Sequence, residues 1–166
     1  MKHVQYFKIS DAISRKFENS EIQTAKRRMR KLIIYTDGGA RGNPGPAGIG
    51  AVFYNEKREL VKKHNGYIGE KTNNEAEYSA VIEALKAAKK LGAGRLEIFM
   101  DSELVQRQLN GIYKVKQAHL QELLREARNL EQNFEKVSYN SIPREKNKTA
   151  DRLVNLAIDR ALKKEV

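Results

Sequence analysis

The chain has 166 residues, 40% of them hydrophobic and 32% charged, and its formal net charge is +11. These values are typical of a folded domain with a basic surface and exclude a disordered chain. The sequence has no cysteine, which excludes disulfides, thiol catalysis and thiolate zinc sites and fits a reducing compartment. We therefore expect a cytoplasmic protein, since no apolar run is long enough to span a membrane and the first residues do not resemble a secretory signal.

Residues 1–30 are expected to form a basic N-terminal extension, followed by a folded domain over residues 31–166. The extension holds eight Lys or Arg and three acids, most densely over 26–30. A helix starting at Ser10 is predicted, but its apolar stripe is thin, so we expect a semi-ordered arm. The positive charge favours a polyanion such as nucleic acid as partner. A solvated tail or a lysine-rich thermophile surface predicts the same composition.

The first strand is predicted over 32–36, an apolar and β-rich run that leads directly into Asp37. A loop rich in glycine and proline follows over 38–50 and is expected to be rigid. Strands over 49–54 and 60–68 are joined by a polar turn. Three strands in succession predict an antiparallel meander.

The next element is a helix that a capping-box pattern from Thr72 to Glu75 opens and that ends near Leu91. A second apolar strand over 95–100 then ends in Asp101. The remaining predicted elements are a helix from 102 to about 110, a helix over about 117–130, a strand over 134–142, a polar loop over 143–147 and a helix from 148. A helical crossover joins the two strands that end in Asp, so they are predicted to be parallel in an α/β sheet.

Two carboxylates are therefore predicted to meet at one edge of the sheet, because Asp37 and Asp101 follow neighbouring parallel strands. Adjacent carboxylates repel each other unless one is protonated or a cation lies between them. Taken singly, Asp101 could be a helix cap and Asp37 a turn residue. Together they favour a divalent metal site with oxygen ligands.

Two further acids are candidates for the same site. Glu77 lies on the apolar stripe of its helix near the start, whereas Glu75 lies on a more exposed side and fits the capping box. Asp151 is in the first turn of the last helix, where a simple helix-dipole role explains it equally well. Asp159 is expected to be a surface acid.

Four motifs, in this order along the chain, resemble the ribonuclease H type 1 family over roughly 31–162. They are Tyr35-Thr36-Asp37-Gly38 with Gly42-Asn43-Pro44-Gly45-Pro46, Thr72-Asn73-Asn74-Glu75-Ala76-Glu77, Met100-Asp101-Ser102 and Asn147-Lys148-Thr149-Ala150-Asp151. The resemblance implies a ribonuclease H-like α/β fold, in which a five-stranded mixed sheet (an antiparallel three-strand meander plus parallel strands) is flanked by helices. It also implies a metal-dependent endonuclease that hydrolyses the RNA strand of RNA/DNA hybrids with two Mg²⁺ or Mn²⁺ ions and leaves 3′-hydroxyl and 5′-phosphate ends.

Carried over residue by residue, the resemblance assigns the catalytic and metal-binding acids to Asp37, Glu77, Asp101 and Asp151. It assigns nucleic-acid contacts to Gly38, Gly39, Asn43, Thr72, Asn73 and Asn74, and the two Asn side chains of the pair could equally be helix caps. The loop that carries a His in many members has none here, and Arg144 or Lys146 is the candidate to take part of its role. The segment 108–116 is too short for the basic protrusion of many members, as in the archaeal-type branch.

The expected partner is an RNA/DNA hybrid, with double-stranded RNA as a further candidate, and the protein is expected to be a monomer with no membrane association. Two other functions remain open. A non-catalytic module that binds hybrid or double-stranded RNA would have no use for four clustered acids. A nuclease of the same fold that acts on DNA is less favoured by the Asn-Asn and glycine-rich motifs.

Overall fold

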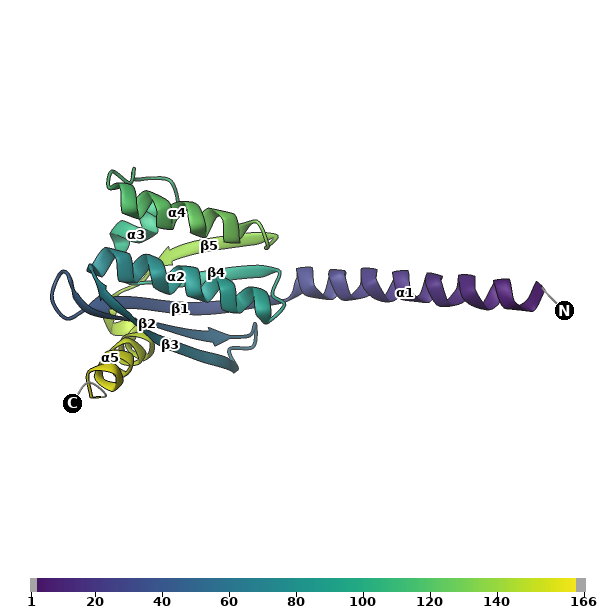
Figure 1. The fold of residues 1–166 in the computed structure, drawn as a ribbon, viewed down its shortest axis with the longest axis horizontal. Coiled ribbons are helices and arrows are strands. Elements are labelled where there is room, and N and C mark those ends of the chain that lie inside the picture. The colour runs from purple at the N-terminus through teal and green to yellow at the C-terminus, as the bar shows by residue number, and fades with distance from the viewer. Residues whose placement is uncertain (1–2, 164–166) are drawn as a thin grey trace.

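The computed structural model describes residues 3–163, and for residues 3–11 and 27–29 it describes the backbone alone. The expected extension and domain therefore each include residues outside the described part, namely 1–2 and 164–166. The strands are β1 (Lys31–Ala40), β2 (Gly45–Tyr54), β3 (Leu60–Lys71), β4 (Arg95–Met100) and β5 (Lys136–Ser141). The helices are α1 (His3–Met29), α2 (Asn73–Lys90), α3 (Glu103–Leu109), α4 (Ala118–Glu131), the 3₁₀ turn η1 (Arg144–Lys146) and α5 (Lys148–Lys163), arranged as in Figure 1.

The five strands form one mixed sheet in the order β3-β2-β1-β4-β5. The pairs β1–β2 and β2–β3 are antiparallel, whereas β1–β4 and β4–β5 are parallel. The predicted meander and the predicted parallel pairing of the two strands that precede Asp37 and Asp101 are both confirmed. The sheet thus brings the two acids to the same edge.

The strand ends differ from the prediction at one point that matters for the site. β1 does not stop at Asp37 but continues to Ala40, because β2 begins already at Gly45 and pairs with it. The parallel pairing with β4 ends earlier, at Tyr35 opposite Phe99. The apolar run before Asp37 could not reveal this second partner, since half of the residues in the paired segments 37–40 and 47–50 are glycine. Asp37 therefore lies inside a strand, just beyond the point where β1 and β4 separate.

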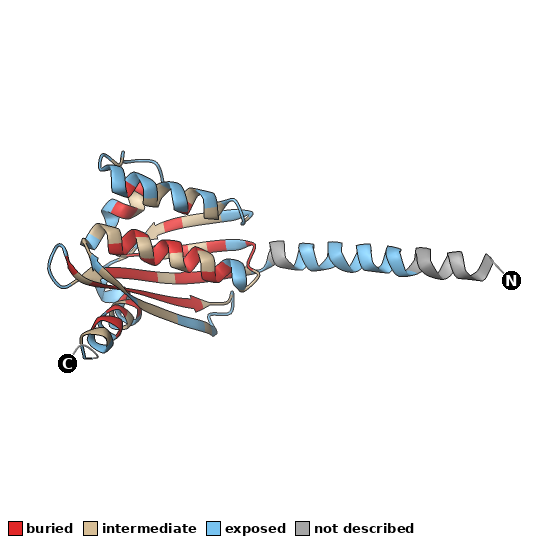
Figure 2. Ribbon diagram, viewed as in Figure 1, coloured by how far each residue is buried: buried red, intermediate tan, exposed pale blue. Residues whose placement is uncertain are grey.

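Helices cover both faces of the sheet, as the alternation of side chains along a strand requires. On one face, α2 packs on a core to which Ile34, Phe53 and Ile98 belong. On the other face lies α5, whose backbone at Ala150 comes so close to β2 that only the hydrogen of Gly50 fits between them. Figure 2 shows the buried central strands between these layers.

The helix α1 extends from the first strand away from the sheet and is longer than the helix predicted from Ser10 (Figure 1). Its described side chains, 12–26, are all exposed, including Phe17 at 68%. The basic run at 26–30 is described in full only at Lys26 and Arg30. Among the described helices, α1 included, none is long and apolar enough to cross a membrane.

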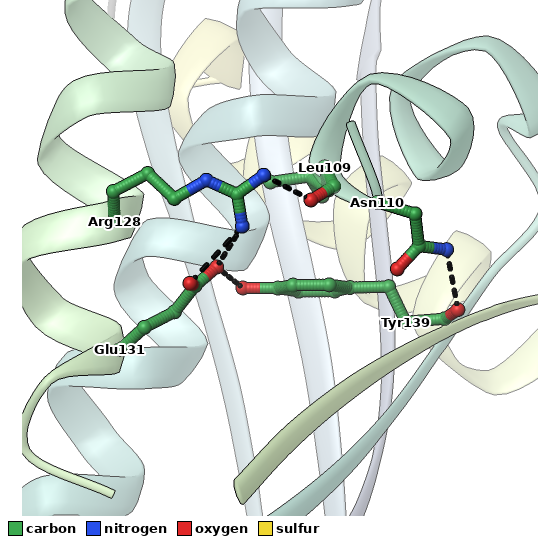
Figure 3. A network of polar contacts seen from close by, with 5 residues as sticks. All are labelled: Leu109, Asn110, Arg128, Glu131 and Tyr139. Carbon is green, nitrogen blue, oxygen red and sulfur yellow. Dashed lines mark hydrogen bonds and ion pairs between the residues drawn. The ribbon is translucent and has the colours of Figure 1, made fainter. Parts of the chain in front are cut away.

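A network of polar contacts fixes α3 and α4 to β5, and Figure 3 shows it from close by. Arg128 of α4 donates to the carbonyl of Leu109 and to Glu131, which in turn accepts the Tyr139 hydroxyl at 2.7 Å. Asn110, just after α3, donates to the carbonyl of Tyr139. The connection between the two helices contains no helical protrusion, as predicted. The network holds α3, which follows Asp101 directly, in a fixed position on the sheet.

Candidate active site

Three elements deliver carboxylates to one point at the edge of the sheet. Asp37 comes from β1, Asp101 follows the last residue of β4, and Glu77 comes from the first turns of α2. One oxygen of each carboxylate lies within 4.8 Å of the others. The helix-cap and turn interpretations of the two aspartates are wrong, because Ser102 caps α3 and Asp37 lies in a strand.

The approach of α2 to β1 depends on Gly38. A Cβ atom at this position would lie 2.1 Å from the carbonyl oxygen of Ala76, so the helix could not come this close to any other residue. Thr72 caps α2 and forms the predicted capping box with Glu75, whose carboxylate accepts the Thr72 N–H at 2.7 Å. Of the two glutamates in this turn, Glu77 is therefore the one that faces the aspartates.

Burial and mutual repulsion make these acids unusual. Asp37 is 7% exposed and Glu77 is 8% exposed. Burial, followed by the charges of Asp101 and Asp151, raises the pKa of Asp37 to about 7. Burial, followed by the charges of Asp37 and Asp101, raises the pKa of Glu77 well above its usual value. An acid of this kind gains most from a bound cation.

The first turn of α5 brings Asp151 to the same cleft, although it is not one of the three acids in closest approach. The guanidinium of Arg144 lies 3.8 Å from its carboxylate and is 82% exposed. The cleft has a volume of about 420 Å³. Its lining residues are Asp37, Gly38, Gly39, Ala40, Arg41, Asn73, Glu77, Asp101, Arg144, Asp151, Val154, Asn155 and Ile158.

The residues predicted to contact nucleic acid do not all reach this cleft. Gly38, Gly39, Asn73 and Arg144 line it, whereas Asn43, Thr72, Asn74 and Lys146 do not. The side-chain oxygen of Asn73 accepts the N–H of Ala40 at 2.9 Å, and that of Asn43 accepts the N–H of Asn73 at 3.1 Å. Lys146 instead lines a separate pocket beside Tyr35 and Arg58. The loop residue that the structure brings to the acids is therefore Arg144.

Asn147 is a site residue that sequence reasoning missed. It is 1% exposed, and its amide nitrogen donates to the carbonyl of Thr36 at 2.9 Å and to Asp101 at 3.4 Å. The backbone carbonyl of Asn147 accepts the N–H of Asp151 at 3.1 Å. The side chain and backbone of this one residue thus connect β1, the end of β4 and the start of α5. An Asn directly before an acid-bearing helix was the available signal, but it looked like an ordinary loop residue.

Arg41 was missed as well. It lines the cleft and forms an ion pair with Asp159 of α5 at 2.6 Å. It is the single charged residue in the run Gly38–Gly50 of glycines, prolines and small residues, which was a usable signal. Asp159 was expected to be a plain surface acid, and the structure gives it a partner in the cleft.

The donor set fits hard divalent cations. All candidate ligands are carboxylate oxygens, which Mg²⁺, Mn²⁺ and Ca²⁺ prefer over the softer nitrogen and sulfur ligands. No cysteine is present, and none of the cleft residues is a histidine. Closely spaced and buried acids with a raised pKa are the arrangement that a divalent cation relieves. The geometry thus fits a hard divalent cation.

Comparison with known proteins identifies the family. A family model described as Reverse transcriptase-like matches residues 35–157. The "Bifunctional protein Rv2228c" of Mycobacterium tuberculosis is 45% identical over 132 residues, which are 79% of this chain and 36% of that protein. The chain thus spans little more than a third of the length of this curated relative.

Solved structures agree with this assignment. The crystal structure of RNase H1 from Halobacterium salinarum is 39% identical with a TM-score of 0.77, and the match covers 78% of this chain and 98% of that one. The structure of LC11-RNase H1 in complex with an RNA/DNA hybrid is 48% identical with a TM-score of 0.76, and the match covers 79% and 99% of the two chains. The order of the strands, the cluster of acids and these matches show that the chain belongs to the Reverse transcriptase-like family and, within it, to ribonuclease H type 1.

Proposed function

We propose that this protein is an endoribonuclease that hydrolyses the RNA strand of RNA/DNA hybrids and leaves 3′-hydroxyl and 5′-phosphate ends. The observation that carries the proposal is the convergence of Asp37, Glu77 and Asp101 at an open cleft, with their oxygens within 4.8 Å of one another. A protein that only binds nucleic acid gains nothing from buried acids facing phosphates, since they repel its ligand.

We propose Asp37, Glu77, Asp101 and Asp151 as the ligands of two Mg²⁺ or Mn²⁺ ions. When bound, such a pair of ions supplies an activated water and stabilises the leaving oxygen. The chain itself holds the carboxylates in place. The N–H of Gly38 donates to the carboxylates of both Asp37 and Glu77, and Asn147 donates to that of Asp101. The ligands are thus oriented before the ions arrive.

Recognition of RNA requires contact with its 2′-hydroxyl. We propose that Asn43 and Asn73 supply part of it. Their side-chain oxygens are already engaged with backbone N–H groups, so the amide nitrogens are the groups that would donate to the minor groove of the hybrid. Gly38 and Gly39 line the cleft without side chains and leave room for the ribose. Thr72 and Asn74 are proposed to act just outside the cleft, on the phosphates of the DNA strand and on the minor groove respectively.

For the role of the missing loop histidine we propose Arg144. Its guanidinium lies at the rim, close enough to Asp151 for a weak ion pair, and its exposure leaves it able to meet a phosphate. Lys146 lines another pocket, so we propose that it contacts the nucleic acid outside the cleft.

The proposal also covers four further properties: the N-terminal extension, a second substrate, the oligomeric state and the location in the cell. Residues 1–30 are proposed as a basic extension apart from the domain 31–166, because α1 runs away from the sheet and its described side chains are exposed. Double-stranded RNA is proposed as a second substrate, since it shares the 2′-hydroxyl. A monomeric state and a cytoplasmic location are proposed, the latter because the chain has no cysteine.

The test is cleavage of a labelled RNA/DNA hybrid with and without Mg²⁺ or Mn²⁺, next to double-stranded RNA and DNA of the same sequence. We expect metal-dependent cleavage of the RNA strand of the hybrid. Asp37→Asn should abolish cleavage while the protein stays folded, and the exposed Glu122→Gln is the matched control. Metal-dependent cleavage by Asp37→Asn would refute the site assignment. If the wild type binds the hybrid but does not cleave it, the protein is a binding module and not a nuclease.

A further inference from the structure

Arg41 occupies a fixed position at one end of the acid cleft. It follows the last residue of β1, and its backbone N–H donates to the carbonyl of Pro46 at 2.8 Å, which continues the pairing of β1 with β2. Its guanidinium lies 2.6 Å from the carboxylate of Asp159 on α5. The side chain remains 42% exposed, so it is held in place but accessible to a ligand.

The charges of the cleft explain why a cation is needed there. Four acids line it, and a nucleic-acid backbone would add further negative charge. The cleft lining contains two cations, Arg41 and Arg144. An arginine matches a phosphate with parallel N–H groups, which makes it the side chain best suited to hold a backbone phosphate near acids.

The two arginines lie too far apart to serve one phosphate. Arg144 is paired with Asp151 and Arg41 with Asp159, which are eight residues apart on α5. Eight residues correspond to about 12 Å along a helix. The cleft therefore has a cation at each of two separate points along the same helix.

We propose that Arg41 binds a backbone phosphate of the nucleic acid, at a point distinct from the acid cluster and from Arg144. This inference rests on the proposed function and assigns one more contact to it. Asp159 orients the guanidinium in the free protein, and the exposed face of the guanidinium receives the phosphate. A purely structural role for the pair explains little, because an ion pair between half-exposed side chains contributes little to folding.

The experiment measures binding of a labelled hybrid to the full-length chain at several salt concentrations in chelator, and KM and kcat with Mg²⁺. Arg41→Ala should raise Kd roughly tenfold, the change expected when one charge-assisted hydrogen bond is lost. The slope of log K against log salt should fall by about 1, as for the loss of one phosphate contact. KM should rise far more than kcat falls, and Arg41→Lys should recover part of the loss.

Two variants separate phosphate binding from a general loss of positive charge and from loss of the ion pair. Arg160→Ala removes the same charge from an exposed neighbour of Asp159 and should change neither Kd nor the slope beyond twofold. Asp159→Asn breaks the ion pair but keeps the arginine, so Kd should stay within threefold of the wild type. The proposal is overturned if Arg41→Ala binds like Arg160→Ala, or if Asp159→Asn reproduces the full loss, since the arginine would then act only by holding the loop to α5.

A set of hybrids with a single neutral methylphosphonate identifies the phosphate. At the contacted position the wild type and Arg41→Ala should bind equally, and at other positions the difference should persist. A difference that persists at every position would also overturn the proposal. If the wild type cleaves no hybrid at all, the proposed function fails, and that result is distinct from an unaltered Kd in Arg41→Ala.

Discussion

Replacing Asp37 by Asn should stabilise the metal-free protein, although it removes a residue of the active site. The carboxylate is 7% exposed and has other acids around it, and its pKa in the folded state is about 7 against an ordinary 3.8. Since about 1.4 kcal/mol corresponds to one pKa unit, the ionised carboxylate lowers the free energy of unfolding by about 4 kcal/mol above pH 7. Asn carries no charge, so it avoids this loss of stability, but it accepts the N–H of Gly38 less strongly. We therefore expect the free energy of unfolding to rise by about 2–4 kcal/mol.

The pH dependence gives the sign of the effect. Near pH 4 Asp37 is protonated in the folded state and still partly protonated in the unfolded state, so the difference in stability between wild type and variant should be small. Between pH 4 and 7 the unfolded chain loses the proton while the folded protein keeps it, so the wild type loses stability with rising pH. Above pH 7 the difference should level off.

The assay is urea unfolding of wild type and Asp37→Asn in chelator from pH 4 to 9, with the exposed Glu122→Gln as control. Repeating it with excess Mg²⁺ should narrow the difference, because an ion that binds only the folded wild type stabilises it by mass action. If Asp37→Asn is less stable than the wild type at pH 8 in chelator, the repulsion inferred from the geometry does not exist. A gain that is equal at pH 4 and pH 8 would refute the titration as its cause.

Three further predictions concern residues around the site. A Cβ at Gly50 would lie 2.4 Å from the carbonyl oxygen of Ala150, so Gly50→Ala should move the start of α5. We expect it to lower the free energy of unfolding by about 1–3 kcal/mol and to reduce cleavage. Gly66→Ala, where a Cβ meets nothing nearer than 3.7 Å, is the control in both the unfolding and the cleavage assay. Asn147→Ala removes a buried donor to Asp101 and should raise the Mg²⁺ concentration needed for half-maximal cleavage, and the Kd for Mg²⁺ in calorimetry, about tenfold. Deleting residues 1–29 removes most of the arm but keeps Arg30, whose carbonyl accepts the N–H of Gly94, and it should weaken hybrid binding and flatten its salt dependence without changing kcat.

Each of these has a clear contrary result. Gly50→Ala with wild-type stability and cleavage would mean that α5 adjusts without moving its acid. An unchanged Kd for Mg²⁺ in Asn147→Ala would mean that the amide of Asn147 has only a structural role. If the Kd for the hybrid and its salt dependence are unchanged after the deletion, the extension does not take part in hybrid binding.

Local sequence patterns determined most elements of the fold. The capping box from Thr72 to Glu75 predicted the start of α2 at the correct residue, because the pattern encodes hydrogen bonds within four residues. The apolar strands before Asp37 and Asp101 and the helical crossover between them predicted a parallel pair. The preference for Glu77 over Glu75 followed from helical periodicity together with the capping-box role of Glu75, and the structure brings Glu77 and not Glu75 to the aspartates.

Tertiary structure alone decided the contacts between residues far apart in the chain. The continuation of β1 past Asp37 depends on pairing with residues 47–50 of β2, where two glycines and an alanine surround Ile49 and give little strand signal. Asn147 bonds to Thr36 over 111 positions, and Arg41 pairs with Asp159 on another element, so no local pattern contains either contact. Arg144 and Lys146 are two residues apart in one loop, yet only Arg144 lines the cleft, and no local pattern indicates which of the two faces the acids. The sequence by itself thus determined which acids the chain offers and on which elements they lie. The hydrogen bonds, ion pairs and strand pairing around those acids arise only from packing. They join segments that lie too far apart along the chain for any periodic pattern to predict.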